Sequence, residues 1–479
     1  MPSPNISFDE IPGSIRKPGK YFEFNTKLAV RTLPNNKQKL LIIGQRTSSG
    51  SVAEAVPTKV FSDKEAETYF GPGSMCHLMV RAAIKANPYL DLTVVALDDA
   101  GAGVVATGTI TPTGPATSAG VLTLYIGNAK VQIAIADEDT AAEIGAALEA
   151  ELDKHSDLPV SAAVVVETGV VTLTAKNKGL CGNDIHVAVE VTASGVTATV
   201  VAMASGATNP DIQDALDAVF AEKYDIVATP YNNEDDLGTL KTHLDLVSGP
   251  LEQRPGVGVY GMNGALADAT TLSALVNSGR ILCAYLRYTG TLRRSMPSEI
   301  ASAMGAVMAY EEDPARPLNT LELTAIAVPL IGDRLSRTEQ ESLLYNGVTP
   351  NEIGPGEIVQ IVRAISTYLL DPQGVEDISL LDITTIRTLD YVRKACRERV
   401  ALRFPREKLS TKTPPKVRSE IIDVLKKLEE LEIVEEVNAN LDGLIVERDS
   451  EDPNRLNAKI PADIVNGLHV FAGRIDLLL

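Results

Sequence analysis

The chain has 479 residues, and at roughly 150 residues per domain this length predicts about three domains. It carries 63 acidic and 44 basic residues, a formal net charge of −19. This balance argues against a nucleic-acid-binding protein and against attachment to an anionic membrane surface, because both need clustered Lys and Arg. Hydrophobic residues make up 44%, which is ordinary for a chain that forms a core.

The N-terminus, the apolar runs and the cysteines indicate the cellular compartment in which the protein folds. The first twenty residues have no apolar signal-peptide core, and no run of 18 or more apolar residues predicts a transmembrane helix. We therefore expect a soluble protein that is made and folded in the cytosol. The four cysteines are spread along the chain without a Cys-x-x-Cys pair, so neither a disulfide framework nor a zinc site is expected.

Residues 1–25 predict an extended N-terminal arm, because four prolines and two glycines forbid a long helix. The arm is nevertheless rich in large apolar side chains, which a disordered tail has little use for. It packs either on its own domain or on a neighbouring subunit. Its candidate contact residues are Ile6, Phe8, Ile11, Ile15, Tyr21, Phe22 and Phe24.

Strand and helix patterns then alternate. Buried strands are predicted at 39–45 and 92–98, and a helix capped by Ser74 at 74–86. The alternation resumes with helices at 211–222, 234–248, 265–278 and 295–312, and with strands at 225–231, 256–261 and 281–288. This rhythm predicts a doubly wound α/β domain that is split in sequence, over 26–99 and 207–318.

Residues 100–206 interrupt this domain. They contain no Arg and one aromatic residue, and they are dense in Thr, Val, Ala and Gly. Strand-like runs at 121–126, 131–135, 170–174 and 185–191 surround one clear helix at 139–154. We interpret this stretch as an inserted β-rich domain with Gly-rich edges.

The last third predicts an α+β domain over 319–466. Residues 320–329 and 357–366 are strand-like, and long helices are predicted at 379–403 and 415–436. Residues 467–479 are β-prone and predict a C-terminal arm strand. Its candidate contact residues are Val470, Phe471, Ile475, Leu477, Leu478 and Leu479.

Motifs for catalysis are missing. The sequence has no P-loop, no G-x-S-x-G elbow and no H-E-x-x-H pair, and its five histidines are far apart. Gly101–Ala106 fits G-x-G-x-x-A, but the residues that follow cannot start the helix that a dinucleotide site needs. Glu311–Asp313 mark either a metal site or a solvated loop, and we favour the loop. We expect no catalytic residue, cofactor or metal.

Charge is unevenly distributed. Residues 1–60 hold nine basic and four acidic residues, a net charge of +5, which leaves −24 on the rest of the chain. A basic, apolar arm on an acidic body suits docking on another copy. Pairing within one chain is the alternative, and the charge balance alone does not separate the two.

Several segments, taken in order, resemble the tail sheath protein of Mu-like contractile-tailed bacteriophages. Near the N-terminus these are ISFDEIPGSIRKPGKYFEFNTKLAV, KQKLLIIGQ and FGPGSMCHLMVRAAIKANP. In the last third they are RPLNTLELTAIAVP, DRLSRTEQESLLYNGVTP, IVQIVRAISTYLLDPQG and DISLLDITTIRTLDYVRKACRERV. The resemblance covers most of the chain outside 100–206.

This resemblance implies a structural subunit without enzymatic activity. Such subunits form stacked hexameric rings around a tail tube, exchange terminal arms as added strands, and contract to drive the tube through the host envelope. The implied partners are other copies of the chain, the tail tube protein, and baseplate and tail terminator proteins. The implied location is the virion tail, after assembly in the host cytoplasm.

Two alternatives remain open at this point. One is a type VI secretion or tailocin sheath subunit, and the other is a ligand-binding enzyme of doubly wound fold. The residues offered for contact with the tube are the basic side chains of the 415–436 helix, although a solvated helical face fits the same pattern. They are Lys416, Arg418, Lys426 and Lys427.

Overall fold

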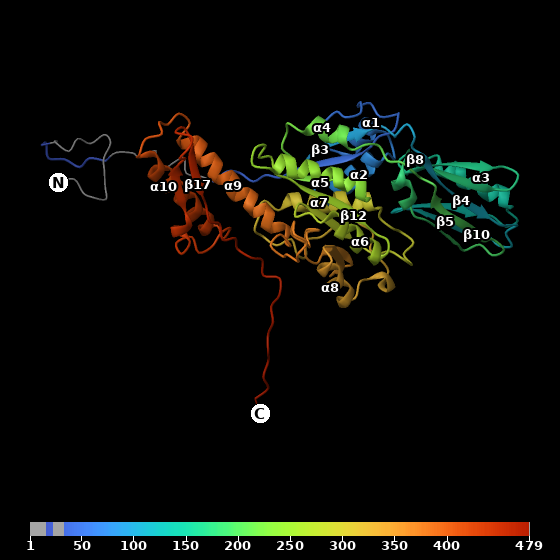
Figure 1. Ribbon diagram of the computed structural model, residues 1–479. Helices are drawn as coiled ribbons and strands as arrows, with labels where there is room; N and C mark the ends of the chain where they lie inside the picture. Colours follow the sequence, from blue (N-terminus) through green and yellow to red (C-terminus); the bar gives the residue numbers. More distant parts are fainter. Residues whose placement is uncertain (1–15, 23–32, 479) are drawn as a thin grey trace. The chain divides into compact units, whose positions relative to one another are not determined.

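The computed structural model describes residues 16–22 and 33–478, in a mixed α/β fold with several sheets (Figure 1). The chain divides into two compact units. A larger unit comprises residues 36–391 and 464–479, and a C-terminal unit comprises residues 392–463 together with residues 1–35. The boundary at residues 391 and 392 falls inside helix α9 (Ile383–Arg403).

The larger unit is built on an eight-stranded sheet with the order β15-β14-β13-β12-β11-β1-β3-β2. Its six central strands pair in parallel, and antiparallel partners, β15 and β2, close the two edges. The strands are β1 (Lys39–Gln45), β2 (Thr58–Lys59), β3 (Asp91–Leu97), β11 (Ile226–Ala228), β12 (Val257–Met262), β13 (Ile281–Tyr285), β14 (Thr349–Gly354) and β15 (Ile358–Ile361).

Strand β1 lies between β3 and β11, so one sheet joins the chain before the insertion to the chain after it. The predicted strand at 39–45 is confirmed by β1, and the strands predicted at 92–98, 225–231, 256–261 and 281–288 correspond to β3, β11, β12 and β13.

Helices cover both faces of this sheet, which explains the continuous apolar run of β1. Leu40 and Ile42 enter one core cluster, whereas Leu41 and Ile43 enter the other, because successive strand residues point to opposite faces. The helices of this unit are α1 (Asp63–Phe70), α2 (Met75–Ala86), α3 (Ala141–Leu152), α4 (Gln213–Val219), α5 (Glu234–Ser248), α6 (Leu266–Val276), α7 (Pro297–Tyr310) and α8 (Arg337–Tyr345).

Local capping defines several of these helices. The Ser74 hydroxyl accepts a hydrogen bond from the His77 N–H at 3.2 Å, which starts α2 as predicted. Asn233 caps α5 in the same way through the Asp236 N–H. At the start of α7, the half-buried Glu299 carboxylate accepts from the Met296 N–H at 2.8 Å, and loss of hydration raises the Glu299 pKa to about 7.

Residues 100–206 form two antiparallel sheets and helix α3, which share one hydrophobic core rich in Val, Leu and Ile. A four-stranded sheet has the order β10-β4-β8-β7, and a three-stranded sheet has the order β6-β5-β9. The strands are β4 (Val105–Pro112), β5 (Gly120–Ile126), β6 (Ala129–Ile135), β7 (Val160–Val165), β8 (Val170–Lys178), β9 (Val187–Val191) and β10 (Ala198–Ala204).

The strand predicted at 320–329 is wrong. Glu322 makes one isolated bridge to Gln360, and Leu323, Ile326 and Ala327 are buried close together in the chain rather than in alternation. Thr320 has a φ of +63°, which bends the chain away from an extended course. The strand predicted at 357–366 is shortened to β15. Val362 still donates to the Pro350 carbonyl opposite it, but Pro350 has no N–H to return the bond, and the ladder ends there.

The C-terminal unit contains the second half of α9, helix α10 (Thr413–Glu430), the turn η4 (Leu441–Gly443) and a hairpin of β16 (Ile445–Arg448) and β17 (Leu456–Lys459). The helix predicted at 415–436 ends six residues early. Glu432 adopts a left-handed φ of +56°, and the Ile433 N–H bonds back to the Leu428 carbonyl.

We predict that Gly261→Ala lowers the free energy of unfolding by about 1–3 kcal/mol, as overpacking does. A Cβ on Gly261 in β12 would lie 2.0 Å from the Pro297 carbonyl oxygen, so α7 could not stay packed against the strand. Urea denaturation followed by circular dichroism measures this loss. The matched control is Gly238→Ala in the exposed part of α5, where a Cβ meets nothing within 4 Å. That change should stabilise by about 0.5–1 kcal/mol; equal effects at both sites would contradict the packing argument.

We predict that Glu299→Gln flattens the pH dependence of stability. The folded pKa of about 7 lies above the ordinary 4.5, so the folded state keeps a proton that the unfolded chain has released. Stability should therefore fall as pH rises from 4.5 to 7 in the parent chain, and less so in the variant. Unfolding measured across this range gives the difference. Glu143→Gln, at the corresponding capping position of exposed α3, is the control and should leave the fall in place.

Candidate assembly surfaces

The N-terminal arm is described only over residues 16–22. There the Tyr21 hydroxyl donates to the Lys17 carbonyl at 2.9 Å, and the Phe22 side chain is 87% exposed. The other predicted arm contacts, Ile6, Phe8, Ile11, Ile15 and Phe24, lie outside the described residues.

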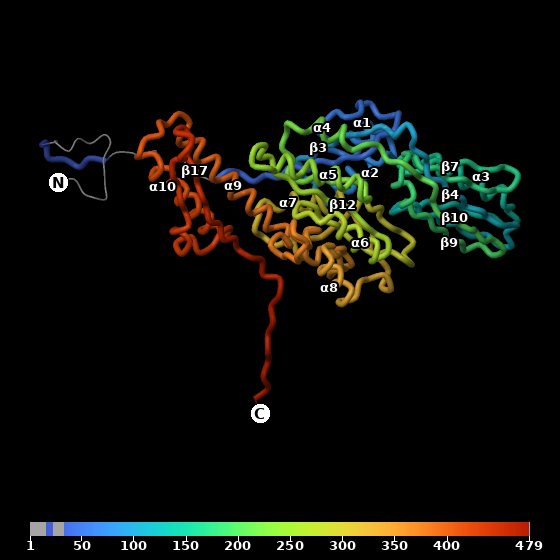
Figure 2. Tube along the Cα trace, viewed as in Figure 1, coloured from blue at the N-terminus to red at the C-terminus, as the bar shows by residue number. Residues whose placement is uncertain are grey.

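The C-terminal arm is an extended, solvent-exposed apolar chain (Figure 2). Its last contacts with the larger unit are made by His469, whose Nδ1 lies 3.0 Å from Asn319 Nδ2 and whose Nε2 lies 3.5 Å from Asp382 Oδ1. From there to Leu478 no strand forms, and Leu479 lies outside the described residues. The predicted contact residues Val470, Phe471, Ile475, Leu477 and Leu478 are between 78% and 98% exposed.

The hairpin of β16 and β17 is a sheet of two strands only within the described part of the chain. Each strand therefore has one edge of backbone N–H and C=O groups without a neighbouring strand. Two-stranded sheets are marginal in water, and additional strands stabilise them. The hairpin therefore offers two strand edges in the C-terminal unit to which a further strand could be added.

The four basic residues of α10 differ in the hydrogen bonds and ion pairs that they make within the chain. Arg418 donates to the Leu441 and Leu444 carbonyls at 2.9 and 3.0 Å, so its guanidinium holds η4 in place. Lys416 lies 3.1 Å from Glu407, and Lys427 lies 3.5 Å from Asp423. Lys426 is exposed. Lys416 and Lys426 are thus the better placed of the four for a contact outside the chain.

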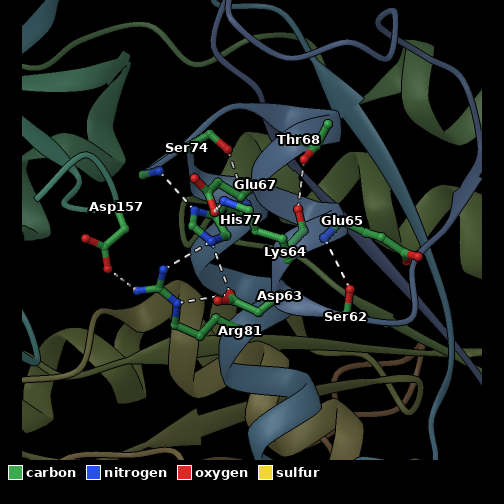
Figure 3. A network of polar contacts seen from close by, with 11 residues as sticks. Ser62, Asp63, Lys64, Glu65, Glu67, Thr68, Ser74, His77, Arg81 and Asp157 are labelled. Carbon is green, nitrogen blue, oxygen red and sulfur yellow. Dashed lines mark hydrogen bonds and ion pairs between the residues drawn. The ribbon is translucent and has the colours of Figure 1, made fainter.

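A polar network joins the inserted domain to the rest of the larger unit, and sequence reasoning missed it (Figure 3). Arg81, on α2, donates to Asp63 of α1 at 3.1 Å and to Asp157 of the inserted domain at 3.0 Å. His77 is buried one turn before Arg81; its Nδ1 accepts from the Gly73 N–H, and its Nε2 lies 3.1 Å from Asp63 Oδ1. Burial and the Arg81 charge lower the His77 pKa, which favours the neutral form of the ring.

Further contacts hold the same junction. Lys176 Nζ donates to the Pro72 and Ser156 carbonyls at 3.1 and 2.5 Å, and Asn177 bonds both the Met75 N–H and the Arg46 carbonyl. Arg293 donates to the Asn128 carbonyl at 3.0 Å. No local sequence pattern predicts these hydrogen-bonded pairs, because the two residues of each pair lie far apart in the sequence.

At the carboxyl ends of β1 and β3, the edge of the sheet where ligands bind in many α/β proteins is occupied by the protein itself. Gln45, at the end of β1, donates to Asp99 at 2.7 Å and to the Lys178 carbonyl of the inserted domain at 2.8 Å. Asp98 is paired with Arg46. Within residues 16–22 and 33–478, no group of three or more His, Cys, Asp or Glu residues could hold a metal ion. No helix in the same ranges is long and apolar enough to cross a membrane.

Comparisons with known proteins agree along the whole chain. Residues 205–367 match the phage tail sheath protein central domain, and residues 375–477 match the phage tail sheath C-terminal domain. The chain is 33% identical to the Mu-like prophage FluMu tail sheath protein of Haemophilus influenzae, over 99% of this chain and 100% of that protein.

Solved structures share the fold at low sequence identity. The sheath tail protein of Desulfitobacterium hafniense is 14% identical, with a TM-score of 0.52 over 94% of this chain and 97% of that one. The sheath tail protein of Listeria innocua is 12% identical, with a TM-score of 0.52 over 91% and 94%. The sheath complex of an extracellular contractile injection system in its contracted state gives a TM-score of 0.51 over 96% and 98%, at 11% identity.

The functional expectation from the sequence is thereby confirmed at the level of the family. Identity to a curated tail sheath protein extends over nearly the full length of both chains, and it makes this protein a structural component of a contractile tail rather than an enzyme. The chain belongs to the phage tail sheath family.

Proposed function

We propose that this protein polymerises as stacked hexameric rings around the tail tube, linked by exchange of terminal arms, and contracts to drive the tube through the host envelope. The observation that carries the proposal is the exposed apolar segment from Val470 to Leu478. Five of its nine residues are exposed large apolar residues, with Arg474 and Asp476 among them. Such a concentration of exposed apolar side chains is unfavourable in water and typical of a chain that binds a partner.

The acceptor that we propose for the arms is the β16–β17 hairpin of a neighbouring subunit. An added strand gains main-chain hydrogen bonds from an open edge, and alternate side chains set its register. Exchange of an arm from one copy to the next is a head-to-tail contact, which produces rings or helical filaments rather than closed dimers. Contraction is then a rearrangement of rigid subunits whose arms remain attached.

The proposal includes the finer organisation of the chain. A doubly wound α/β domain over 26–99 and 207–318 is split by the inserted domain 100–206, and the sheath domain 319–466 lies between it and the C-terminal arm 467–479. Residues 1–25 form the N-terminal arm. Assembly takes place in the host cytoplasm, and the partners are the tail tube, baseplate and tail terminator proteins. The likeness to a contractile injection system sheath supports the same mechanics, and the 33% identity to a prophage protein favours a phage tail.

We predict that removal of residues 470–479 abolishes long polymers and leaves the fold intact. The deletion keeps the His469 contacts and removes exposed side chains, so the free energy of unfolding should change by no more than about 0.5 kcal/mol. Negative-stain microscopy and urea denaturation measure the two effects. Val166→Ser removes a 70% exposed apolar side chain from the inserted domain and is the control that should still polymerise. Polymers of normal length from the truncated chain would refute arm exchange.

We predict that the double variant Lys416→Glu and Lys426→Glu weakens co-assembly with the tail tube protein without unfolding the chain. Both side chains are exposed, so reversal changes the surface charge and also removes the ion pair between Lys416 and Glu407. Co-sedimentation with purified tube measures the effect. Lys130→Glu, at an exposed position of the inserted domain, is the matched control. If tube binding is unchanged at low salt, these residues do not face the tube.

A further inference from the structure

The charges of the C-terminal unit are segregated along its sequence. Residues 392–427 hold twelve basic and four acidic residues, whereas residues 428–463 hold three basic and eleven acidic residues. The stretch is neutral as a whole. Ordinary soluble surfaces intersperse the two signs, so a division of this size calls for a physical explanation.

The helices α9 and α10 place the basic loop between them and the acidic residues after α10 at opposite ends of a helical hairpin. Arg399 of α9 lies 3.2 Å from Glu420 and 2.6 Å from Asp423 of α10, and Lys416 lies 3.1 Å from Glu407. Later residues of α9 thus meet earlier residues of α10, so the two helices run antiparallel (Figure 1). Residues 404–412 form the loop at one end, and the C-terminus of α10 lies at the other.

One end of this helical hairpin carries unpaired positive charge. We name Arg406, Lys408 and Lys412 the basic tip. All three side chains are exposed, and within the described residues none has an ion-pair partner. The acidic residue between them, Glu407, is already engaged by Lys416.

The opposite end carries unpaired negative charge. We name Glu430, Glu432, Glu435 and Glu436 the acidic ridge. These side chains are exposed, and none has an ion-pair partner in the described part of the chain. Asp463 adds a further carboxylate nearby, because its carbonyl accepts from the Glu435 N–H at 2.8 Å. Lys427, one turn earlier, is engaged by Asp423.

The tip and the ridge of one chain cannot neutralise each other. The 18 residues of α10 separate them by about 27 Å at 1.5 Å per residue, and the Arg399 ion pairs hold the hairpin in this form. This distance is several times the screening length of about 8 Å at physiological salt. Each cluster therefore repels itself and attracts its opposite only on another molecule.

We propose that the basic tip of one copy docks on the acidic ridge of the next copy. This contact deepens the proposed polymerisation and rests on it. It is a second head-to-tail contact, distinct from the apolar arms, and its electrostatic character would set the direction and speed of subunit addition.

The experiment uses the full chain in two charge-reversed forms. The first is Arg406→Glu/Lys408→Glu/Lys412→Glu, and the second is Glu430→Lys/Glu432→Lys/Glu435→Lys/Glu436→Lys. Each should raise the concentration needed for polymerisation about tenfold or more, because tip and ridge then carry the same sign. An equimolar mixture should polymerise again, since each variant's tip now faces an opposite ridge on the other variant. Sedimentation at 50 mM and 1 M salt should show the difference shrinking with salt.

Several outcomes would overturn the contact. They are unchanged polymerisation of either variant, a mixture that stays as poor as its components, or a tip variant that loses only its binding to the tail tube. Neutral Gln substitutions at the same seven positions test the contact if a reversed chain folds poorly, and they should give a smaller loss of the same kind. The matched controls Lys130→Glu and Glu341→Lys reverse exposed charges on the larger unit and should polymerise normally. Failure of the unaltered chain to polymerise would instead refute the proposed function.

Discussion

The pairing of β1 with both β3 and β11 is the interaction on which the larger unit depends. It brings chain segments from either side of the inserted domain into one parallel sheet, with core clusters on both faces. Because both faces of β1 are covered, the side chains on both faces must be apolar, as those of Leu40 to Ile43 are. Because β1 is held on both sides, its carboxyl end at Gln45 is a fixed platform on which the inserted domain rests.

Residues 100–206 are joined to the rest of the larger unit by several side-chain contacts as well as by the two connecting segments of the chain. Their contacts with Arg81, and those made by Lys176 and Asn177, reach two segments of the surrounding unit: the stretch from Pro72 to Arg81 and the end of β1 at Arg46. Most are charge-assisted or made to backbone carbonyls. Contacts of the same region cover the carboxyl ends of β1 and β3. A single arrangement thus supports residues 100–206 and fills this part of the sheet edge.

Regular elements with strong local signals were predictable from the sequence. The continuous apolar run of β1 and the Ser74 cap of α2 are encoded within a few residues, and both appear where expected. The failures share one cause, which is tertiary context. Residues 320–329 have strand-like composition but pack by consecutive burial, and α10 stops because Glu432 turns left-handed. The Arg81 network joins residues 76 positions apart, so no local pattern announces it. The role of the terminal arms remains a prediction, because the contacts proposed for them are with another copy of the chain.

His469 fixes the point at which the C-terminal arm leaves the larger unit. Its ring is held beside Asn319 and Asp382, and the chain beyond it makes no strand up to Leu478. The nine residues from Val470 to Leu478 reach about 30 Å when they are extended. In the proposed polymer, the arm of every copy would start from the same place on the sheet-bearing unit. These nine residues could then pair only with a strand edge that lies within that reach, so the anchor at one histidine would help to select the neighbour.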